Sequence, residues 1–333
     1  MLGKLDTWLT KHPKRKDLHG WRRFIVEFWF FGLKEARACL FAGLFFIAMF
    51  LVPKTGWLGI SRYDLLLIFA ISVQAAMLYF KLETWDEVKS ITLFHLVGFA
   101  LEWFKTSGDI QSWSYPDEAY TKIGGVPLFA GFMYAAVGSY IIQAWRLFDL
   151  KIKNHPPYWL GTLCALAIYI NFFTHHYIGD YRWYLAAFAL GLYARTTVLY
   201  TPYDTTRKMP LLLAFVLIGF FIWLAENLGT LFGVWRYPNQ IGAWASVHIS
   251  KWSSWALLVM MTFTIVANLK HIKHGGFAFE VQLSITEKGQ YAVAYGLSCK
   301  KDCHELHTTD PRRTIPYPIP VPPLHRRRNR QTA

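Results

Sequence analysis

Charge is scarce in this chain except near its two ends. Of 333 residues, 17% are charged, whereas 54% are hydrophobic and 18% are aromatic. Long stretches without charge are typical of an integral membrane protein. Lys and Arg number 35 against 21 Asp and Glu, which gives a net charge of +14. Because no recognised nucleic-acid-binding motif accompanies this charge, we attribute it to membrane topology and lipid headgroups and expect no nucleic-acid partner.

Cysteine is scarce as well. The four cysteines (Cys39, Cys164, Cys299 and Cys303) are too few and too scattered for a disulfide scaffold. The first two fall inside apolar runs, where a cysteine serves as a small packing residue. The other two stand beside His304 without the second pair of ligands that a structural zinc site requires. We therefore expect neither a metal nor a cofactor.

Eight apolar runs are long enough to cross a bilayer, which takes about 18–25 residues in a helix. They cover 34–53, 63–80, 88–107, 124–147, 157–175, 182–200, 210–231 and 246–270. The first twenty residues are polar and basic and lack the apolar core of a cleavable signal peptide, so the first run is expected to start insertion. The sequence thus predicts an all-α polytopic membrane protein with about eight transmembrane helices.

Lys and Arg are distributed unequally between the two sides of the predicted membrane. Nine of them lie between Lys4 and Arg37, and seven more occupy alternate loops on the same side, against seven in the opposite loops. Because positively charged loops stay in the cytoplasm, both termini are predicted to be cytoplasmic. We expect a multi-pass protein of the bacterial plasma membrane that contacts membrane lipids; its oligomeric state is left open.

A polar pattern occurs twice, each time at the end of an apolar run. Both copies have a Glu, a Thr four residues later, and a closing Trp-x-Tyr-Pro. The copies comprise Glu102, Thr106, Trp113 and Tyr115, and Glu226, Thr230, Trp235 and Tyr237. At a similar offset, Gly59-x-x-Arg62 recurs as Gly179-x-x-Arg182. Because four runs per copy is an even number, we predict two parallel four-helix repeats, with both patterns at the outer face.

The chain accordingly divides into four predicted parts. They are a basic cytoplasmic N-terminal segment (1–33), a first transmembrane repeat (34–147), a second transmembrane repeat (148–274) and a polar tail rich in Pro and Arg (275–333). The tail is expected to be disordered and to touch anionic headgroups.

Burying a carboxyl group at the end of an apolar run costs free energy, so its presence there indicates a functional or structural role. In the third run, His95, Glu102 and Thr106 lie within about 20° of one line along a helix, so they share a face. That face either lines a cavity with binding or catalytic residues or forms a helix-packing seam. The seventh run has Gly219 in place of the histidine, so the halves are not equivalent. One carboxyl group would then be active and the other structural or binding.

The remaining candidates are aromatic and basic. Trp113, Tyr115, Trp235 and Tyr237 are either interfacial anchors or the walls of a lipid pocket. After the fifth run, His175 and Asp180 are predicted to form a hydrogen-bonded helix exit. Arg62 and Arg182 occupy equivalent places in the two halves and are expected to pair with the carboxylates or with a lipid phosphate.

Two resemblances follow from these residues. Over about residues 20–274 the chain is similar to the YoaT-like family of bacterial integral-membrane proteins (domain of unknown function 817), which implies no particular activity. At the level of motifs it also resembles membrane carotenoid hydratases and, more remotely, lycopene cyclases. The motif corresponds here to Glu102, Thr106, Gly108, Trp113, Tyr115 and Gly125–Val–Pro127–Leu128. The second half departs from it, because Gly242–Ala–Trp244 replaces the last stretch.

The first functional hypothesis is an enzyme that hydrates or cyclises a double bond of an isoprenoid- or carotenoid-like lipid. Such a reaction needs a proton donor and a stabilised carbocation. A carboxyl group in apolar surroundings retains its proton more readily, so Glu102 or Glu226 is the expected acid. The aromatic ring faces would stabilise positive charge, and His95 would take the proton back.

Two alternatives belong to other classes. In a proton-coupled transporter, the two repeats would rock around the paired carboxylates. In a non-catalytic assembly protein, the carboxylates would only pair with Arg62 and Arg182.

Overall fold

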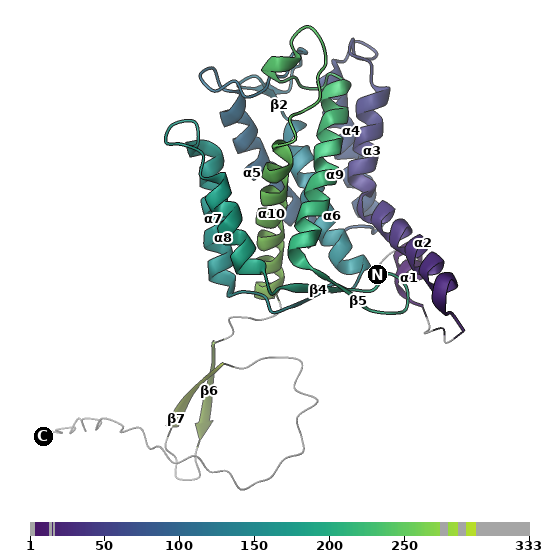
Figure 1. The fold of residues 1–333 in the computed structure, drawn as a ribbon, viewed down its shortest axis with the longest axis vertical. Coiled ribbons are helices and arrows are strands. Elements are labelled where there is room, and N and C mark those ends of the chain that lie inside the picture. Colours follow the sequence, from purple (N-terminus) through teal and green to yellow (C-terminus); the bar gives the residue numbers. More distant parts are fainter. Residues whose placement is uncertain (1–3, 13–14, 16, 274–278, 286–290, 298–333) are drawn as a thin grey trace, which may run out of the picture. The chain divides into compact units, whose positions relative to one another are not determined.

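The structure is a computed structural model that describes residues 4–12, 15, 17–273, 279–285 and 291–297 (Figure 1). It divides into two compact units, Met1–Lys270 and His271–Ala333. In the second unit, strands β6 (Phe279–Ile285) and β7 (Tyr291–Leu297) pair as an antiparallel hairpin. The rest of the predicted tail lies outside the described residues.

The first unit is mostly helical, as predicted. The helices are α1 (Lys4–Thr10), α2 (Gly20–Ala38), α3 (Leu40–Leu51), α4 (Arg62–Tyr79), α5 (Trp85–Thr106), α6 (Ala130–Leu147), α7 (Tyr158–Thr174), α8 (Arg182–Tyr193), α9 (Leu211–Leu231) and α10 (Lys251–Lys273). Of the described helices, α4, α9 and α10 are long and apolar enough to cross a membrane, while α3 and α7 are shorter apolar helices.

The first predicted run and the N-terminal segment differ from expectation. The run 34–53 is interrupted at Cys39, where α2 ends and α3 begins. Helix α2 extends back to Gly20, so the predicted basic segment is partly helical. One face of α2 exposes Trp21, Phe28 and Trp29, which is typical of a helix lying in a membrane interface.

The sixth predicted run is only partly helical, and the all-α description was wrong there. Helix α8 ends at Tyr193, and residues Thr197–Tyr200 form β4. Strand β4 pairs antiparallel with β3 (Lys151–Lys153) and with β5 (Arg207–Pro210). Consecutive β-branched residues at 196–198 favour an extended backbone, and the two neighbouring strands supply its hydrogen bonds.

The fourth predicted run also begins later than expected. Strands β1 (Lys122–Ile123) and β2 (Val126–Pro127) form a small hairpin before α6. Gly124 and Gly125 both have positive φ (59° and 83°), which suits a two-residue turn between twisted strands.

The two copies of the polar pattern meet at one end of the bundle. Helices α5 and α9 end there, and the loops that follow carry β2 and the 3-10 turn Pro238–Gln240; β4, β5 and α1 lie at the opposite end (Figure 1). The backbone N–H of Ser114 donates to the carbonyl of Arg236, and the N–H of Arg236 donates to the carbonyl of Ser114, both at 2.9 Å. The two Trp-x-Tyr segments are therefore paired antiparallel through their middle residues.

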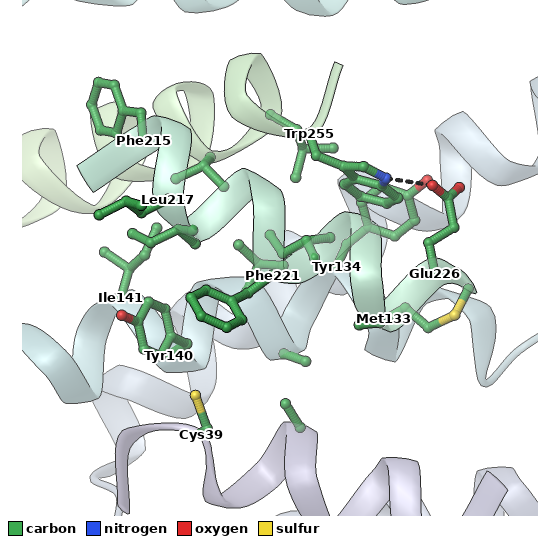
Figure 2. Close-up of a pocket in the computed structure, with 18 of the residues that line it drawn as sticks. Cys39, Met133, Tyr134, Tyr140, Ile141, Phe215, Leu217, Phe221, Glu226 and Trp255 are labelled. Carbon is green, nitrogen blue, oxygen red and sulfur yellow. Dashed lines mark hydrogen bonds between the residues drawn. The ribbon is translucent and has the colours of Figure 1, made fainter. Parts of the chain in front are cut away.

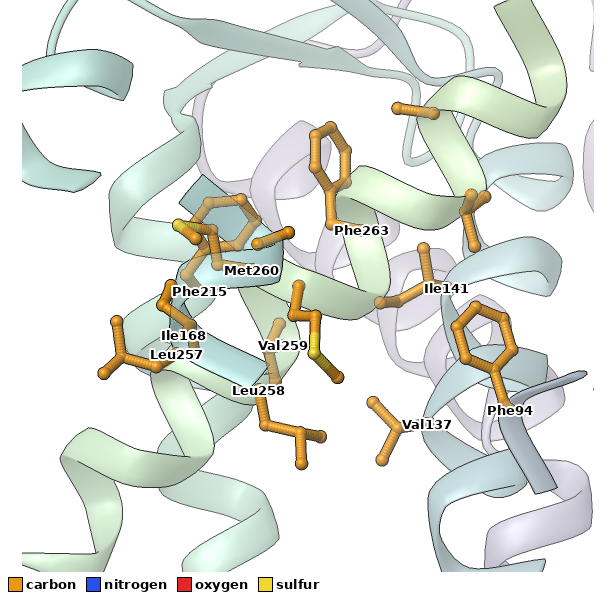
Figure 3. Packing of buried hydrophobic residues seen from close by; sticks show 14 of the residues in the cluster. Phe94, Val137, Ile141, Ile168, Phe215, Leu257, Leu258, Val259, Met260 and Phe263 are labelled. Atoms are coloured by element: carbon orange, nitrogen blue, oxygen red, sulfur yellow. The ribbon is translucent and has the colours of Figure 1, made fainter. Parts of the chain in front are cut away.

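A large apolar core joins α5, α6, α7, α9 and α10. Phe94, Ile141, Phe215 and Phe263 are among its members (Figure 3). Helices α5 and α6 approach closely because glycine stands at their contacts. A Cβ at Gly98 would lie 2.4 Å from the Tyr134 ring, so this glycine lets Tyr134 lie flat against α5.

Buried ion pairs fasten the opposite end of the bundle. Asp6 is fully buried, and Arg37 donates to both of its carboxylate oxygens at 2.9 and 3.1 Å. Arg146 reaches the same carboxylate at 3.3 Å and also pairs with Glu87 at 2.7 Å. These contacts tie α1, α2, α5 and α6 together, and removing one partner would leave a buried charge uncompensated.

We expect Asp6→Ala to lower the free energy of unfolding by about 3–5 kcal/mol, because Arg37 would lose its buried counterion. Thermal unfolding of the detergent-solubilised protein, followed by tryptophan fluorescence, measures the effect. Asp17→Ala is the matched control, since its 3.4 Å contact with Arg15 is largely exposed and exposed pairs contribute little. Equal melting temperatures for the two variants would contradict the expectation.

Candidate functional site

Glu102, near the end of α5, is buried among aromatic hydrogen-bond donors. Its side chain is 3% exposed. The indole N–H of Trp113 donates to Oε2 at 2.7 Å, and the hydroxyl of Tyr115 donates to the same oxygen at 2.8 Å. The hydroxyl of Tyr134, from α6, donates to Oε1 at 2.8 Å. Three donors from two different elements thus fix the orientation of this carboxyl group.

Glu226, near the end of α9, has a related but different set of donors. Tyr237 donates its hydroxyl to Oε1, as Tyr115 does in the first copy. The indole donor is Trp255 of α10, at 2.7 Å from Oε2 (Figure 2). Trp235 instead packs against Gly229, where a Cβ would lie 2.1 Å from its ring. The second copy therefore recruits its indole from another helix.

Both carboxyl groups line one cavity of about 850 Å³. The surroundings of the two carboxyl groups are in contact, because the ring centroids of Trp113 and Tyr237 are 6.0 Å apart. From Glu226 the cavity extends between apolar side chains to Cys39 and Tyr140 (Figure 2). It is therefore a long apolar space with two carboxyl groups at one end.

The far end of the cavity holds a third carboxyl group. Tyr140 donates its hydroxyl to Glu35 at 3.0 Å, and both residues line the space. Between Glu35 and the two carboxyl groups at the other end, the lining consists mainly of aliphatic and aromatic side chains. The polar groups are thus confined to the two ends.

The surroundings of Glu102 and Glu226 favour proton exchange over charge pairing. In the described part of the chain, neither carboxyl group forms an ion pair, and every side-chain partner is an indole or a phenol. A carboxyl group held by neutral donors beside a ligand cavity can act as a general acid or base.

Basic side chains flank the same end of the cavity. The ammonium of Lys105 lies 3.2 Å from Nε2 of His175 and 2.9 Å from Nε2 of His176. Partial burial, and after it the charge of Lys105, lower the pKa of His176 to about 4. This imidazole is therefore neutral at pH 7 and accepts a hydrogen bond from Lys105. The ammonium of Lys251 lies over the Trp113 ring, 5.3 Å from its centroid.

The structure places many of the predicted site residues together. Those that line the cavity are Glu102, Glu226, Trp113, Tyr115, Trp235, Tyr237, His175 and Arg182. Asp180 lies beside it, paired with Arg182 at 3.0 Å and bonded by Asn171 at 3.3 Å. These two contacts tie Asp180 to α7 and α8.

Other predicted residues lie apart from the cavity. His95 packs against α6, with its ring over Gly131 and 4.5 Å from the Phe132 ring, in the manner of a helix-packing seam. The hydroxyls of Thr106 and Thr230 bond to backbone carbonyls of their own helices.

The arginines do not pair with the repeated acids. Arg62 donates to the carbonyls of Met49 and Phe232 at 2.9 and 3.1 Å and lies 3.8 Å from Asp117. Arg182 pairs with Asp180. Of the two expected pairings, the one with Glu102 and Glu226 does not form among the described residues, and the one with a lipid phosphate stays a prediction.

Sequence reasoning missed Tyr134, Trp255, Lys105 and Lys251 as site residues. Lys251 and Trp255 are four residues apart at the start of the last apolar run, and this spacing on one helix face could have indicated them. Tyr134 lies in an aromatic run without a distinguishing pattern. Within the described ranges, no group of three His, Cys, Asp or Glu residues could hold a metal ion.

Comparisons with known proteins identify relatives of this chain. The model of the family described as "Protein of unknown function (DUF817)" matches residues 27–263. The "Uncharacterized protein YoaT" of Bacillus subtilis (strain 168) is 47% identical over 251 residues, which cover 75% of this chain and 94% of the relative. No solved structure matches. Neither relationship supports the motif-level resemblance to carotenoid hydratases. The predicted family is confirmed: the chain belongs to the YoaT-like DUF817 family.

Proposed function

We propose that this protein is a multi-pass protein of the bacterial plasma membrane that acts on a long-chain, isoprenoid-type lipid. The lipid would occupy the cavity, and Glu102 and Glu226 would serve as acid and base in hydration or cyclisation of a double bond. One observation carries the proposal: two buried carboxyl groups, each held by neutral aromatic donors, line the end of a single elongated apolar cavity.

The proposed topology has more membrane spans than the three helices that qualify by composition. Three helices qualify as membrane spans by length and hydropathy, and α3 and α7 are apolar but shorter. We place both termini in the cytoplasm and treat the chain as two related four-helix halves. The reciprocal bonds between Ser114 and Arg236 support this relation, because equivalent residues of two copies pair with each other across a local two-fold axis.

The cavity suits a hydrocarbon chain in size and chemistry. Its volume of about 850 Å³ is near the upper end of the roughly 300–1,000 Å³ typical of ligand pockets. Its walls between Glu226 and Tyr140 are aliphatic and aromatic (Figure 2). In a cyclisation, such walls would keep water from the reacting double bond and protect the carbocation from capture.

The proposed reaction needs one proton donor and one acceptor. A carboxyl O–H would transfer its proton to one carbon of the double bond, which leaves the positive charge on the neighbouring carbon. In hydration, water would bond to that carbon and give a proton to the second carboxylate. In cyclisation, a second double bond would attack that carbon instead, and the new cation would lose a proton to the second carboxylate. Because Glu102 and Glu226 share the cavity, the second carboxylate replaces His95 in the role of acceptor.

Ring faces beside the acids would stabilise the transient cation. Lys251 already lies over Trp113 and Tyr237, so those two faces hold an ammonium. We therefore assign this role to Tyr134 and Trp255, whose ring centroids are 6.3 Å apart and which line the cavity beside the carboxyl groups.

A transporter that couples lipid movement to protons is the alternative, because paired carboxylates between two related halves would also suit that task. The position of both acids at one end of the cavity favours the enzyme. A non-catalytic assembly role based on Glu–Arg pairing has no support, since those pairs do not form.

The first test concerns the carboxyl groups. We expect the protein, purified in mild detergent, to carry an isoprenoid lipid that mass spectrometry identifies. Glu102→Gln and Glu226→Gln should still bind lipid, because Gln preserves the shape, but should accumulate the unreacted form, since Gln cannot donate a proton. For a hydration, this form lacks the elements of one water.

The control for these variants is Glu118→Gln, an exposed carboxyl group at the same end of the bundle. It should carry the same lipid as the parent protein. If the lipid is identical in all four proteins, the enzymatic proposal fails and the transporter is favoured. If none of them contains an isoprenoid, the proposed ligand class is wrong.

The second test fills the cavity without touching the acids. Ala214 of α9 lines the apolar part, so Ala214→Phe should reduce the amount of bound lipid by about tenfold, equivalent to ~1.4 kcal/mol of binding free energy. The measurement is the molar ratio of extracted lipid to protein. Ala187→Phe, at an exposed position of α8, is the matched control and should retain the lipid. Equal lipid content in both variants would place the lipid outside the cavity.

A further inference from the structure

Four basic side chains converge where the two carboxyl groups lie. Lys105, His175, Arg182 and Lys251 all line the cavity. They come from the end of α5, the residue after α7, the start of α8 and the start of α10. Because four elements contribute, the grouping is a product of the tertiary fold.

Lys251 is the least satisfied of these groups. Its ammonium lies 4.8 Å from the Tyr237 ring centroid and 5.3 Å from that of Trp113. Among the described residues, it forms no ion pair, and its ammonium has no hydrogen-bond acceptor. An ammonium carries three N–H donors, which remain available to an acceptor. The ring faces hold the charge in place but satisfy none of the donors.

Lys105 and Arg182 are also incompletely neutralised. Lys105 is held by His175 and His176, and the neutral imidazole of His176 gives it an acceptor but no negative charge. Arg182 pairs with Asp180 at 3.0 Å, while its buried Nε has no acceptor among the described residues. Three basic side chains therefore share one paired carboxylate.

The carboxyl groups at this end are hydrogen-bonded to other side chains. Glu102 and Glu226 accept hydrogen bonds from indole and phenol groups and form no ion pair with the lysines or with Arg182 in the described part of the chain. One end of the cavity, called here its cationic mouth, thus carries the basic side chains and the two carboxyl groups, and the rest of the lining is mainly apolar.

We propose that Lys105, Arg182 and Lys251 bind the phosphate headgroup of the lipid that occupies the cavity. This inference rests on the proposed function and narrows its ligand to an isoprenoid phosphate or diphosphate. A phosphate ester offers at least three acceptor oxygens and up to two negative charges, which matches three cations on separate elements. A carboxylate offers only two oxygens and a single negative charge.

The headgroup position also orders the substrate in the cavity. With the phosphate at the cationic mouth, the chain runs toward Glu35 and Tyr140 at the far end. Glu102 and Glu226 then face the isoprene units nearest the headgroup, so the double bonds at that end are the ones within reach of the acids.

The test compares ligands that differ only in the headgroup. The full-length protein in nanodiscs of neutral phosphatidylcholine is titrated with geranylgeranyl phosphate and with geranylgeraniol, and binding is followed by tryptophan fluorescence. We expect the phosphate to bind at least about tenfold more tightly than the alcohol. Lys251→Gln and Lys105→Gln should each remove most of that preference and leave the affinity for geranylgeraniol unchanged.

Controls separate loss of binding from loss of folding. Lys54→Gln removes an exposed lysine at the same end of the bundle and should retain the preference. Lys251→Arg keeps the charge and should retain it largely. A Lys251→Gln protein that still binds geranylgeraniol is folded, so its reduced phosphate affinity reports on the headgroup site.

Three further outcomes would each contradict a different part of the proposal. Equal affinities for geranylgeranyl phosphate and geranylgeraniol would eliminate the headgroup site and leave the lipid cavity standing. Failure of both ligands to bind would remove the proposed function together with the inference. If inorganic phosphate competes as tightly as geranylgeranyl phosphate, the site binds a free anion and the lipid assignment is wrong.

Discussion

The burial of two carboxyl groups at the end of an apolar cavity is the constraint on which this architecture depends. A buried polar group without partners costs several kcal/mol, so each carboxyl oxygen must find a donor. Glu102 draws Trp113 and Tyr115 from the following loop onto α5 and holds Tyr134 of α6 in place. Glu226 does the same for its own loop and for α10. The requirement for donors thus shapes the loops as much as the cavity.

The repeated pattern predicted the polar end of the cavity but not all of its contacts. A Glu followed by Trp-x-Tyr, 11 residues later in the first copy and 9 in the second, marked this end, and in the first copy both aromatic residues bond to Glu102. In the second copy, Trp235 turns away because Gly229 leaves room for its ring, and the indole comes from α10. The different position of Trp235 thus depends on the absence of a side chain at Gly229, and a pattern of polar residues does not record this.

Helical periodicity and hydropathy were limited in a similar way. The stripe through His95 and Glu102 describes one face of α5, yet α6 covers the histidine, because Gly131 admits its ring, while the glutamate reaches the cavity. Hydropathy located the apolar runs but not the ends of the helices. Residues 197–200 form a strand instead of a helix, because they pair with β3 and β5. These differences depend on contacts between distant segments, and composition within a window does not record them.

Charge at the cavity mouth follows from the same hydrogen bonds. The nearby ammonium of Lys251 forms no ion pair with Glu102 or Glu226 among the described residues. Indole and phenol groups donate to the carboxyl oxygens, and the ammonium lies over ring faces, which attract a cation without satisfying its N–H groups. The aromatic residues therefore separate acid from base, and this separation leaves the carboxyl groups available for proton transfer and the lysines available for an anion. A site that binds a charged headgroup and exchanges protons with the chain beside it requires both groups to be kept apart in this way.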